Sequence, residues 1–416
     1  MTKKKLPLAF WIFIGLAVGV VAGLALMPLP DGAGVNIAKT YIKPWGDIFL
    51  NLLKFVVVPI VLFSIASGVI SMKDISKVGA IGGKTVVYYM CTTAFAVLLS
   101  LVLASGAKAM HLFTALSTTG LEYTPPEGQS LMDTFVNIFP SNAITPLANA
   151  SMLQVIVISL LLGFGILLAK EKGMVAAQVV DSFNEVCQKI MDLIIRLSPI
   201  GVACLLCPVV AENGPKVLGK LAMVLLVAYV GYAVHALVVY SLTVKTLGGV
   251  GPMAFFKGMA PAMMMAFSSA SSVGTLPFTL ECSEKLGARR EVASFVLPLG
   301  ATINMDGTAI YQGVCAIFIA TAFGIDLSLG QMVTIVLTAT LASIGTAGVP
   351  GAGMVMLAMV LQSVNIPIEG IALVAGIDRI FDMGRTTVNI TGDAACAVIV
   401  SKMEDRKTAK TQGVVR

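Results

Sequence analysis

The sequence predicts an all-α, polytopic membrane protein with eight transmembrane helices and two re-entrant helical hairpins. Of its 416 residues, 57% are hydrophobic and only 12% are charged, whereas a soluble globular protein has about 25% charged residues. Apolar stretches of about 20 residues, the length of a helix that crosses a bilayer, recur from end to end. Two further apolar stretches are interrupted near their centres, and these are the expected hairpins.

The expected full spans alternate with polar segments that carry most of the lysines and arginines. In chain order the spans are Leu8–Met27, Pro44–Ile70, Thr85–Ala107, Ser151–Ala169, Val175–Val210, Leu218–Leu247, Val292–Ala322 and Ile368–Val400. If both termini are cytoplasmic, the basic residues then fall on one side of the bilayer, as the positive-inside rule requires. Lys3–Lys5 precede a long first span without a small-residue cleavage pattern, so no cleavable signal peptide is expected. The polar stretch Leu112–Gln129 reads as an extracellular loop.

The two interrupted segments have centres that disfavour a continuous helix. Gly251–Leu286 has a serine-rich centre at Phe267–Pro277, and Ser328–Asn365 has a glycine-rich centre at Ser343–Gly353. Non-helical backbone at membrane depth is tolerated only where it is buried in protein or lines a cavity. Two such hairpins, one from each face, match the inverted-repeat plan of secondary transporters. Two kinked full spans are the alternative.

The last span carries a row of polar residues on one helical face. At about 100° per residue they fall within an arc of about 100°. The residues are Asp378, Asp382, Arg385, Thr386, Asn389 and Asp393. A charged group at the bilayer centre costs about 2.5–3.5 kcal/mol, so these charges must pair or bind a ligand. The face predicts a polar site, with an inter-helix salt-bridge seam as the alternative. Arg379 is expected to be a structural partner of a carboxylate.

A candidate cation site lies in the preceding span. Asn304, Asp306 and Thr308 lie at mid-span, and Gly307 is free to unwind the helix there. Unwound carbonyls, together with carboxylate and amide oxygens, form a cage of hard ligands that suits a cation such as Na⁺. No cofactor is expected besides Na⁺ as the coupling ion.

A weaker polar cluster lies in the third span, where Tyr89, Thr92 and Thr93 occupy positions i, i+3 and i+4. These residues share one helical face. Serine and threonine commonly pack or hydrogen-bond to the backbone inside membrane helices. Taken alone, this cluster therefore indicates core packing.

Other functional classes lack support in the sequence. The net charge of +6 is spread over span ends and is not typical of nucleic-acid binding. Cys204 and Cys207 form a CxxC in apolar surroundings, where a buried pair of small hydrophobic residues is favoured over a metal or redox site. His111 and His235 form no metal or nucleophile motif, so structural roles are expected and an intramembrane enzyme is disfavoured.

Four motifs, in order along the chain, resemble those of the glutamate transporter family. They are Ser268–Thr275, Asn304–Thr308, Gly348–Gly353 and the row from Asp378 to Asp393. That family includes the excitatory amino acid transporters and the archaeal and bacterial sodium/aspartate symporters. The resemblance covers essentially the whole chain, and four matching motifs are highly specific.

The resemblance implies an amino-acid site. Its members would be Arg385, Asp382, Thr386, Asn389 and Thr308, with main-chain groups near Ser272, Val349 and Gly353. Arg385 would hold the side-chain carboxylate of the substrate in a bidentate contact. Asp382 would bind the substrate amino group. An arginine here favours a dicarboxylic substrate, because a neutral side chain would leave its charge unpaired.

The resemblance also implies three Na⁺ sites. The first comprises Asp393 and carbonyls of Gly300, Asn304 and Asn389. The second comprises main-chain oxygens of Thr302, Ser343, Ile344 and Thr346. The third comprises Tyr89, Thr92, Thr93, Asn304 and Asp306. Because Asp306 and Asp393 repel an anionic substrate until cations neutralise them, cation and substrate binding should be positively cooperative.

The implied protein is a homotrimeric elevator in the lipid bilayer of a prokaryotic inner membrane. Residues 1–80 and 111–215 would form a fixed scaffold, residues 81–110 and 216–404 a moving transport domain, and residues 405–416 a cytoplasmic tail. The expected activity is Na⁺-coupled symport of L-aspartate, with L-glutamate as a second substrate. The alternatives are a proton-coupled glutamate or dicarboxylate symporter of the same family, and a ligand-gated anion channel.

The chain departs from its relatives at several positions. Archaeal members carry an arginine where this chain has Ala270, and eukaryotic members carry one where it has Met383, so Asp382 is expected to lack a second arginine. Val273 replaces a serine that many relatives have. Gln312 stands where animal members have a glutamate linked to proton transport, so no proton is expected to be carried there.

Overall fold

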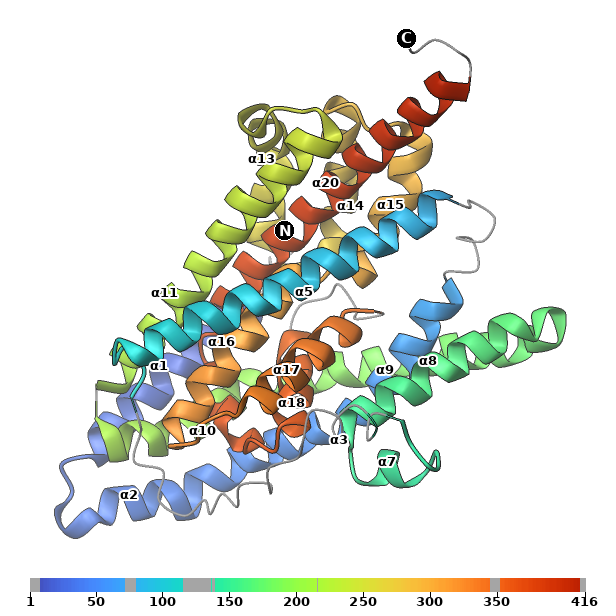
Figure 1. The fold of residues 1–416 in the computed structure, drawn as a ribbon. Helices are drawn as coiled ribbons and strands as arrows, with labels where there is room; N and C mark the ends of the chain where they lie inside the picture. The colour runs from blue at the N-terminus through green and yellow to red at the C-terminus, as the bar shows by residue number, and fades with distance from the viewer. Residues whose placement is uncertain are drawn as a thin grey trace, which may run out of the picture.

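The computed structural model describes residues 8–71, 80–114, 136, 139–214, 216–344 and 352–411. Within these ranges every regular element is a helix (Figure 1), which confirms the predicted all-α class. Lys3–Lys5, most of Leu112–Gln129, and the predicted site residues Thr346 and Val349 lie outside the described residues.

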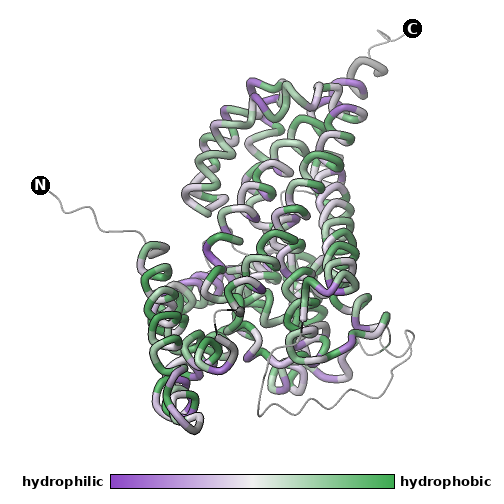
Figure 2. Tube along the Cα trace, turned by 90° about the vertical axis from the view of Figure 1, so that its left-hand side faces the viewer, coloured by the Kyte–Doolittle hydropathy of each residue, from purple (hydrophilic) through white to green (hydrophobic). Residues whose placement is uncertain are grey.

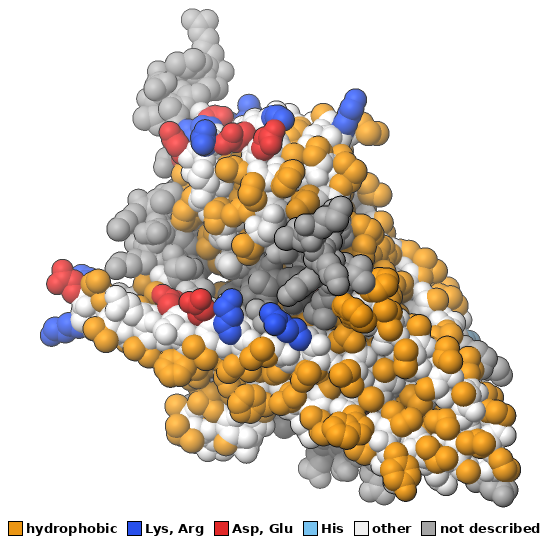
Figure 3. All heavy atoms as spheres, turned by 180° about the vertical axis from the view of Figure 1, so that it is seen from behind, with side chains coloured by type: hydrophobic (Ala, Val, Ile, Leu, Met, Phe, Trp, Pro, Cys, Tyr) orange, Lys and Arg blue, Asp and Glu red, His pale blue; other side chains and the backbone are white. Residues whose placement is uncertain are grey.

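Long apolar helices support a polytopic membrane protein. By length and composition, four of the described helical stretches could each cross a membrane: Ala33–Ile70, Ile81–Ala109, Leu218–Gly248 and Arg290–Ala322. A bent pair, Lys170–Arg196 with Ser198–Glu212, would make a fifth span. Hydrophobic residues run along most of the chain trace (Figure 2) and cover much of the lower body in Figure 3, whereas charged side chains gather at its upper end and in one band. The exact number of eight spans stays a prediction.

Three predicted spans are broken in the structure. Val175–Val210 is two helices, α9 (Met174–Arg196) and α10 (Ser198–Asn213), which meet at a bend of 52°. Pro199 at the start of α10 has no N–H to continue the hydrogen-bond ladder of α9. The stretch still counts as one candidate span, but a bent one, and length and apolarity alone do not report such a bend.

The other two breaks lie beside the polar motifs. Val292–Ala322 divides into α15 (Arg290–Ile303) and α16 (Asp306–Ala322), so the helix unwinds at Asn304 and Met305, just before Gly307. Ile368–Val400 divides into a 3₁₀ turn, the short α19 (Ile371–Ala375) and the long α20 (Asp378–Thr411). The second predicted span also begins earlier, because one helical stretch runs from Ala33 to Ile70.

One set of helices packs together in the lower part of Figure 1. It comprises α1 (Leu8–Leu26), α3 (Lys43–Ser71), α8 (Met152–Leu168), α9 and α10. Helix α1 lies on α10 through Gly15, Gly19 and Gly23, and a Cβ on any of them would collide with the α10 backbone. Small residues spaced in this way allow close approach of helices in membranes.

A second set of helices is centred on α20. Packed against α20 are α5 (Ala80–Ala109), α11 (Lys216–Val234), α13 (Pro252–Ser269), α14 (Ser272–Lys285), α15 and α16. Helices α17 (Leu329–Ala342) and α18 (Ala352–Ser363) join this set through contacts of α17 with α5 and of α18 with α16. The remaining elements are short: α2 (Ala33–Ile37), α7 (Thr145–Ala148), α12 (Ser241–Thr243) and the 3₁₀ or π turns Pro30–Gly32, Ala38–Ile42, Lys170–Gly173, His235–Tyr240, Val244–Gly248 and Ile368–Gly370.

Both interrupted segments fold back on themselves. Helix α13 packs against α14, and α17 packs against α18. At 1.5 Å per residue, the 14 residues of α14 or α17 extend about 21 Å, which is short of the roughly 30 Å hydrocarbon core. This arrangement favours hairpins over kinked full spans.

Candidate functional site

The polar face of α20 is buried, as its spacing predicted. Each of its six members is at most 5% exposed: Asp378, Asp382, Arg385, Thr386, Asn389 and Asp393. Buried polar groups require hydrogen-bond or ion partners, because an unpaired charge in an apolar interior is very costly. The partners come from α20 itself, from α16, and from Asn304 and Met305 in the break before α16.

Arg385 lies between two carboxylates of its own helix. Its Nε donates to Asp382 Oδ1 at 2.9 Å, while Nη1 and Nη2 lie 3.1 and 3.4 Å from the two oxygens of Asp378. The Arg385 guanidinium also lies 4.8 Å from the ring centroid of Tyr311, in a cation–π arrangement. Because these ion pairs stay within α20, they do not form the inter-helix seam considered from the sequence.

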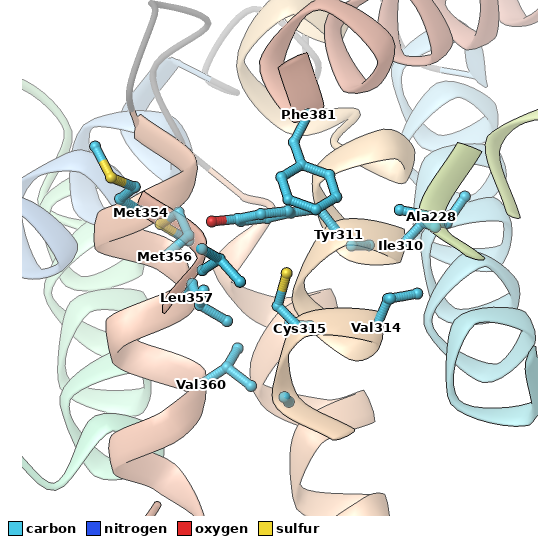
Figure 4. Close-up of a cluster of buried hydrophobic side chains, with 14 of the residues drawn as sticks. Ala228, Ile310, Tyr311, Val314, Cys315, Met354, Met356, Leu357, Val360 and Phe381 are labelled. Carbon is cyan, nitrogen blue, oxygen red and sulfur yellow. The ribbon is translucent and has the colours of Figure 1, made fainter. Parts of the chain in front are cut away.

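Two glycines bring neighbouring helices against Arg385. A Cβ on Gly353, in the first turn of α18, would collide with the guanidinium, and one on Gly307 would collide with the Arg385 backbone. Figure 4 shows the apolar cluster beside this point, with Tyr311 pointing from α16 toward Met356 and with Phe381 next to it. Helices α16, α18 and α20 therefore converge on one guanidinium.

Asn389 holds the broken start of α16. Its Oδ1 accepts a hydrogen bond from the Gly307 N–H at 2.8 Å, and its Nδ2 lies 3.3 Å from Met305 Sδ and 3.5 Å from Thr308 Oγ1. The first N–H groups of a helix have no partner within that helix, so this contact satisfies one of them. One turn earlier, Thr386 Oγ1 lies 3.5 Å from Asp382 Oδ1.

The first predicted cation set is brought together. Asn304 Nδ2 donates to the Asn389 carbonyl and to Asp393 Oδ1, both at 2.9 Å. Gly300 approaches so closely that a Cβ there would lie 2.7 Å from Asp393 Cγ and 2.5 Å from the Tyr89 hydroxyl. Asn304 Oδ1 is buried without a hydrogen-bond partner. Carboxylate, carbonyl and amide oxygens in one buried place are the ligands that a hard cation prefers.

The third predicted cation set is brought together only in part: Tyr89 donates to the Val296 carbonyl and Asn304 to the Asn389 carbonyl and Asp393, while Thr92 and Thr93 meet at Asp306. Thr93 and Thr92 donate to its Oδ1 at 2.6 and 3.3 Å. Its Oδ2 accepts from Tyr240 at 2.8 Å and lies 3.1 Å from His235 Nε2. His235 and Tyr240 belong to the π-helical turn after α11, and sequence reasoning did not place them in the site. Both lie 66 or more positions from Asp306, so local spacing carries no signal for them.

The rest of the predicted set is only partly described. Thr302 and Ser343 donate hydrogen bonds to carbonyls of their own helices, Leu299 and Thr340. Ile344 follows Ser343 and is buried. Ser272 is buried at the first position of α14. The second cation set therefore stays a prediction, as do the roles of all these residues.

One expectation about the site was wrong. Asp382 does have a second arginine near it, because Nη1 of Arg379 lies 3.7 Å from its Oδ2. The two positions at which family members carry that arginine are Ala270 and Met383 in this chain. Arg379 was expected to pair with a carboxylate, and this is confirmed.

Comparisons with known proteins give matches over almost the whole chain. The family model of the sodium:dicarboxylate symporter family matches residues 8–403. The proton/sodium-glutamate symport protein of Geobacillus stearothermophilus is 36% identical over 411 residues, 96% of this chain and 95% of the relative. The proton/glutamate-aspartate symporter of Escherichia coli is 35% identical over 98% of this chain and 96% of the relative. The C4-dicarboxylate transport protein of Bacillus subtilis is 32% identical, with coverages of 95% and 93%.

Proposed function

Because the chain belongs to the sodium:dicarboxylate symporter family, whose members are transporters and not enzymes, we propose that it is a Na⁺-coupled symporter for L-aspartate, with L-glutamate as a second substrate. The observation that carries the proposal is the buried Arg385, held between Asp378 and Asp382 beneath Gly353. The membrane would be the inner membrane of a prokaryote.

The charges around Arg385 favour an amino acid with an acidic side chain. A substrate carboxylate can replace one of the two aspartates as the bidentate partner of the guanidinium. Asp382, released from Arg385, is then available to the substrate ammonium group. A dicarboxylate without an ammonium group would leave Asp382 facing a like charge, which is unfavourable in a buried site.

Sodium is favoured as the coupling ion by the oxygens around Asp306 and Asp393. Both carboxylates are buried among hydroxyl, amide and carbonyl oxygens. Two buried carboxylates and a substrate of net charge −1 would be balanced by three monovalent cations, in line with three predicted sites. Each cation removes repulsion against the substrate, so binding would be cooperative.

The arrangement of helices supports movement of one unit against another. The set α1, α3, α8, α9 and α10 would form the fixed scaffold of a homotrimer, and the helices around α20 would form the transport domain. The α13–α14 and α17–α18 pairs would act as the inner and outer re-entrant hairpins over the substrate. This division follows the predicted boundaries at residues 80, 110 and 215.

A proton-coupled glutamate or dicarboxylate symporter is the second candidate. It is favoured by the names of the relatives, which include proton-coupled glutamate carriers and a C4-dicarboxylate transport protein. Asp382 argues against a plain dicarboxylate, and Gln312 on α16 is an amide that does not titrate.

Equilibrium binding to the purified protein tests the substrate and the ion together. L-aspartate and succinate, which lacks the amino group, are titrated in Na⁺ and in choline buffers at two pH values. The proposal expects aspartate to bind only with Na⁺ and more tightly than succinate. Sodium-independent binding that strengthens at low pH would favour the proton-coupled candidate, and tighter succinate binding would overturn the amino-acid assignment.

A further inference from the structure

Arg379 joins the polar face of α20 to the turn between α13 and α14. Its Nη2 donates a hydrogen bond of 3.1 Å to the Ser269 carbonyl, and its Nη1 lies 3.7 Å from Asp382 Oδ2. The side chain is only 15% exposed. Asp382 Oδ1 also accepts a hydrogen bond from Arg385, so two guanidiniums share the carboxylate of Asp382. The guanidinium of Arg379 additionally contacts the turn.

The turn that Arg379 contacts is tight. Ser269 ends α13, Ala270 adopts a left-handed φ of 51°, and Ser271 Oγ caps α14 by accepting the Gly274 N–H at 3.1 Å. The last carbonyls of a helix have no donor within that helix and carry the negative end of its dipole. Arg379 supplies both a donor and a positive charge at this end of α13.

Arg379 also reduces the negative potential that Asp382 presents to a substrate ammonium group, an effect that rests on the proposed function. An arriving ammonium group must share Asp382 with the Arg379 guanidinium, and like charges around one carboxylate repel each other. A ligand without an ammonium group meets no such repulsion. The contact with the turn, in contrast, affects every ligand that the turn covers.

We propose that Arg379 is a positioning and specificity residue: it fastens the α13–α14 turn to α20 and moderates the preference of the site for amino acids over dicarboxylates that lack an amino group. The two effects are separable. Loss of the tether changes the binding of both ligand classes alike, whereas loss of the positive charge changes only the binding of the ligand that carries an ammonium group.

Affinity ratios test the specificity effect. The variants are Arg379→Ala, Arg379→Lys and a control, Arg290→Ala, whose arginine is exposed at the start of α15. Relative to wild type, Arg379→Ala should shift the ratio of L-aspartate to succinate affinity toward aspartate by about threefold or more. Arg379→Lys keeps the charge and should stay near the wild-type ratio, as should the control. An unchanged ratio in Arg379→Ala overturns the specificity effect.

Thiol labelling tests the tether without any substrate. Ala270 is buried at the turn, so Ala270→Cys is introduced into the wild type, Arg379→Ala and Arg379→Lys. The rate of maleimide labelling of each protein is compared with that of the same protein without Ala270→Cys. Loss of one hydrogen bond, worth about 0.5–1.5 kcal/mol, should speed labelling about 2- to 12-fold in Arg379→Ala. Arg379→Lys should also label faster, because an ammonium cannot span both partners. Unchanged labelling in both variants overturns the tether.

The two arms separate this inference from the proposed function. If the wild-type protein binds no L-aspartate under any condition, the proposed function fails, and the labelling arm still decides whether Arg379 holds the turn. If the wild type binds aspartate while labelling and the affinity ratio are both insensitive to Arg379, the inference alone fails.

Discussion

Gly353 and Arg385 approach so closely that a Cβ at position 353 would collide with the Arg385 guanidinium. A Cβ there would lie 2.7 Å from Arg385 Nη2 and closer still to Nη1. The first turn of α18 therefore packs directly against the guanidinium that the proposed substrate would contact. A change at Gly353 should consequently affect both the position of α18 and the binding geometry of Arg385.

Gly353→Ala should weaken L-aspartate binding. The added methyl group must displace either α18 or the guanidinium, and overpacking of this kind costs about 1–3 kcal/mol, equivalent to about 5- to 150-fold in affinity. Isothermal titration in saturating Na⁺ measures the effect. Gly219→Ala in α11, where a Cβ meets nothing within 4 Å, is the control and should bind as the wild type does. Equal binding by both variants would contradict the close contact.

Gly300→Ala should weaken Na⁺ binding more than it weakens L-aspartate binding at saturating Na⁺. Its Cβ would lie 2.7 Å from Asp393 Cγ and 2.5 Å from the Tyr89 hydroxyl, which is where the first cation set converges. The Na⁺ concentration that half-saturates aspartate binding should rise by about the same 5- to 150-fold, whereas aspartate affinity at very high Na⁺ should approach the wild-type value. A weaker aspartate affinity with an unchanged Na⁺ dependence would argue against a cation at Asp393.

Asp306→Asn should lower both stability and sodium cooperativity. The amide nitrogen cannot accept a hydrogen bond from Tyr240 or Thr93, and each buried group left unpaired costs about 1–3 kcal/mol. Loss of the negative charge also weakens the proposed cation site at Asp306, so the Hill coefficient for Na⁺ should fall. Asp326→Asn, at an exposed loop carboxylate that pairs with Lys108, is the matched control. Thermal unfolding and Na⁺ titration of both variants provide the comparison.

Gly19→Leu should destabilise the protein without changing its sodium dependence. A Cβ at Gly19 would meet the Ala203 carbonyl oxygen of α10 at 2.7 Å, so α1 must move away from α10. The thermal midpoint should fall, while the Na⁺ dependence of binding should remain that of the wild type, because α1 lies outside the site. Val18→Leu on the exposed side of α1 should leave the midpoint unchanged. A changed Na⁺ dependence in Gly19→Leu would show that the two helix sets are coupled.

The sequence was a good guide wherever the relevant residues share one helix. The six polar residues of α20 repeat at helical spacing, so their common buried face followed from periodicity alone. The break between α15 and α16 followed from Gly307 amid polar residues, although the structure unwinds at Asn304 and Met305 instead. The family, predicted from four motifs, is confirmed by the match over residues 8–403.

Contacts between distant segments could be predicted only where the family resemblance named them, as it did for Thr93 and Asp306. His235 and Tyr240 meet Asp306 only because the π-helical turn after α11 packs beside α5 and α20, and nothing near them in the sequence marks that contact. Arg379 lies three positions before Asp382 on the same helix, so helical spacing could have indicated this second arginine, whereas its contact with Ser269, 110 positions away, depends on how the α13–α14 turn docks. The bend between α9 and α10 lies at Pro199 and is not reported by hydrophobic length.

Gradient-driven uptake tests the central claim most directly. Proteoliposomes loaded with K⁺ receive radiolabelled L-aspartate under an inward Na⁺ gradient or an inward H⁺ gradient, for the wild type and for Arg385→Ala. The account predicts uptake by the wild type under the Na⁺ gradient alone and none by the variant. Uptake driven by the H⁺ gradient alone, or full uptake by Arg385→Ala, would contradict it.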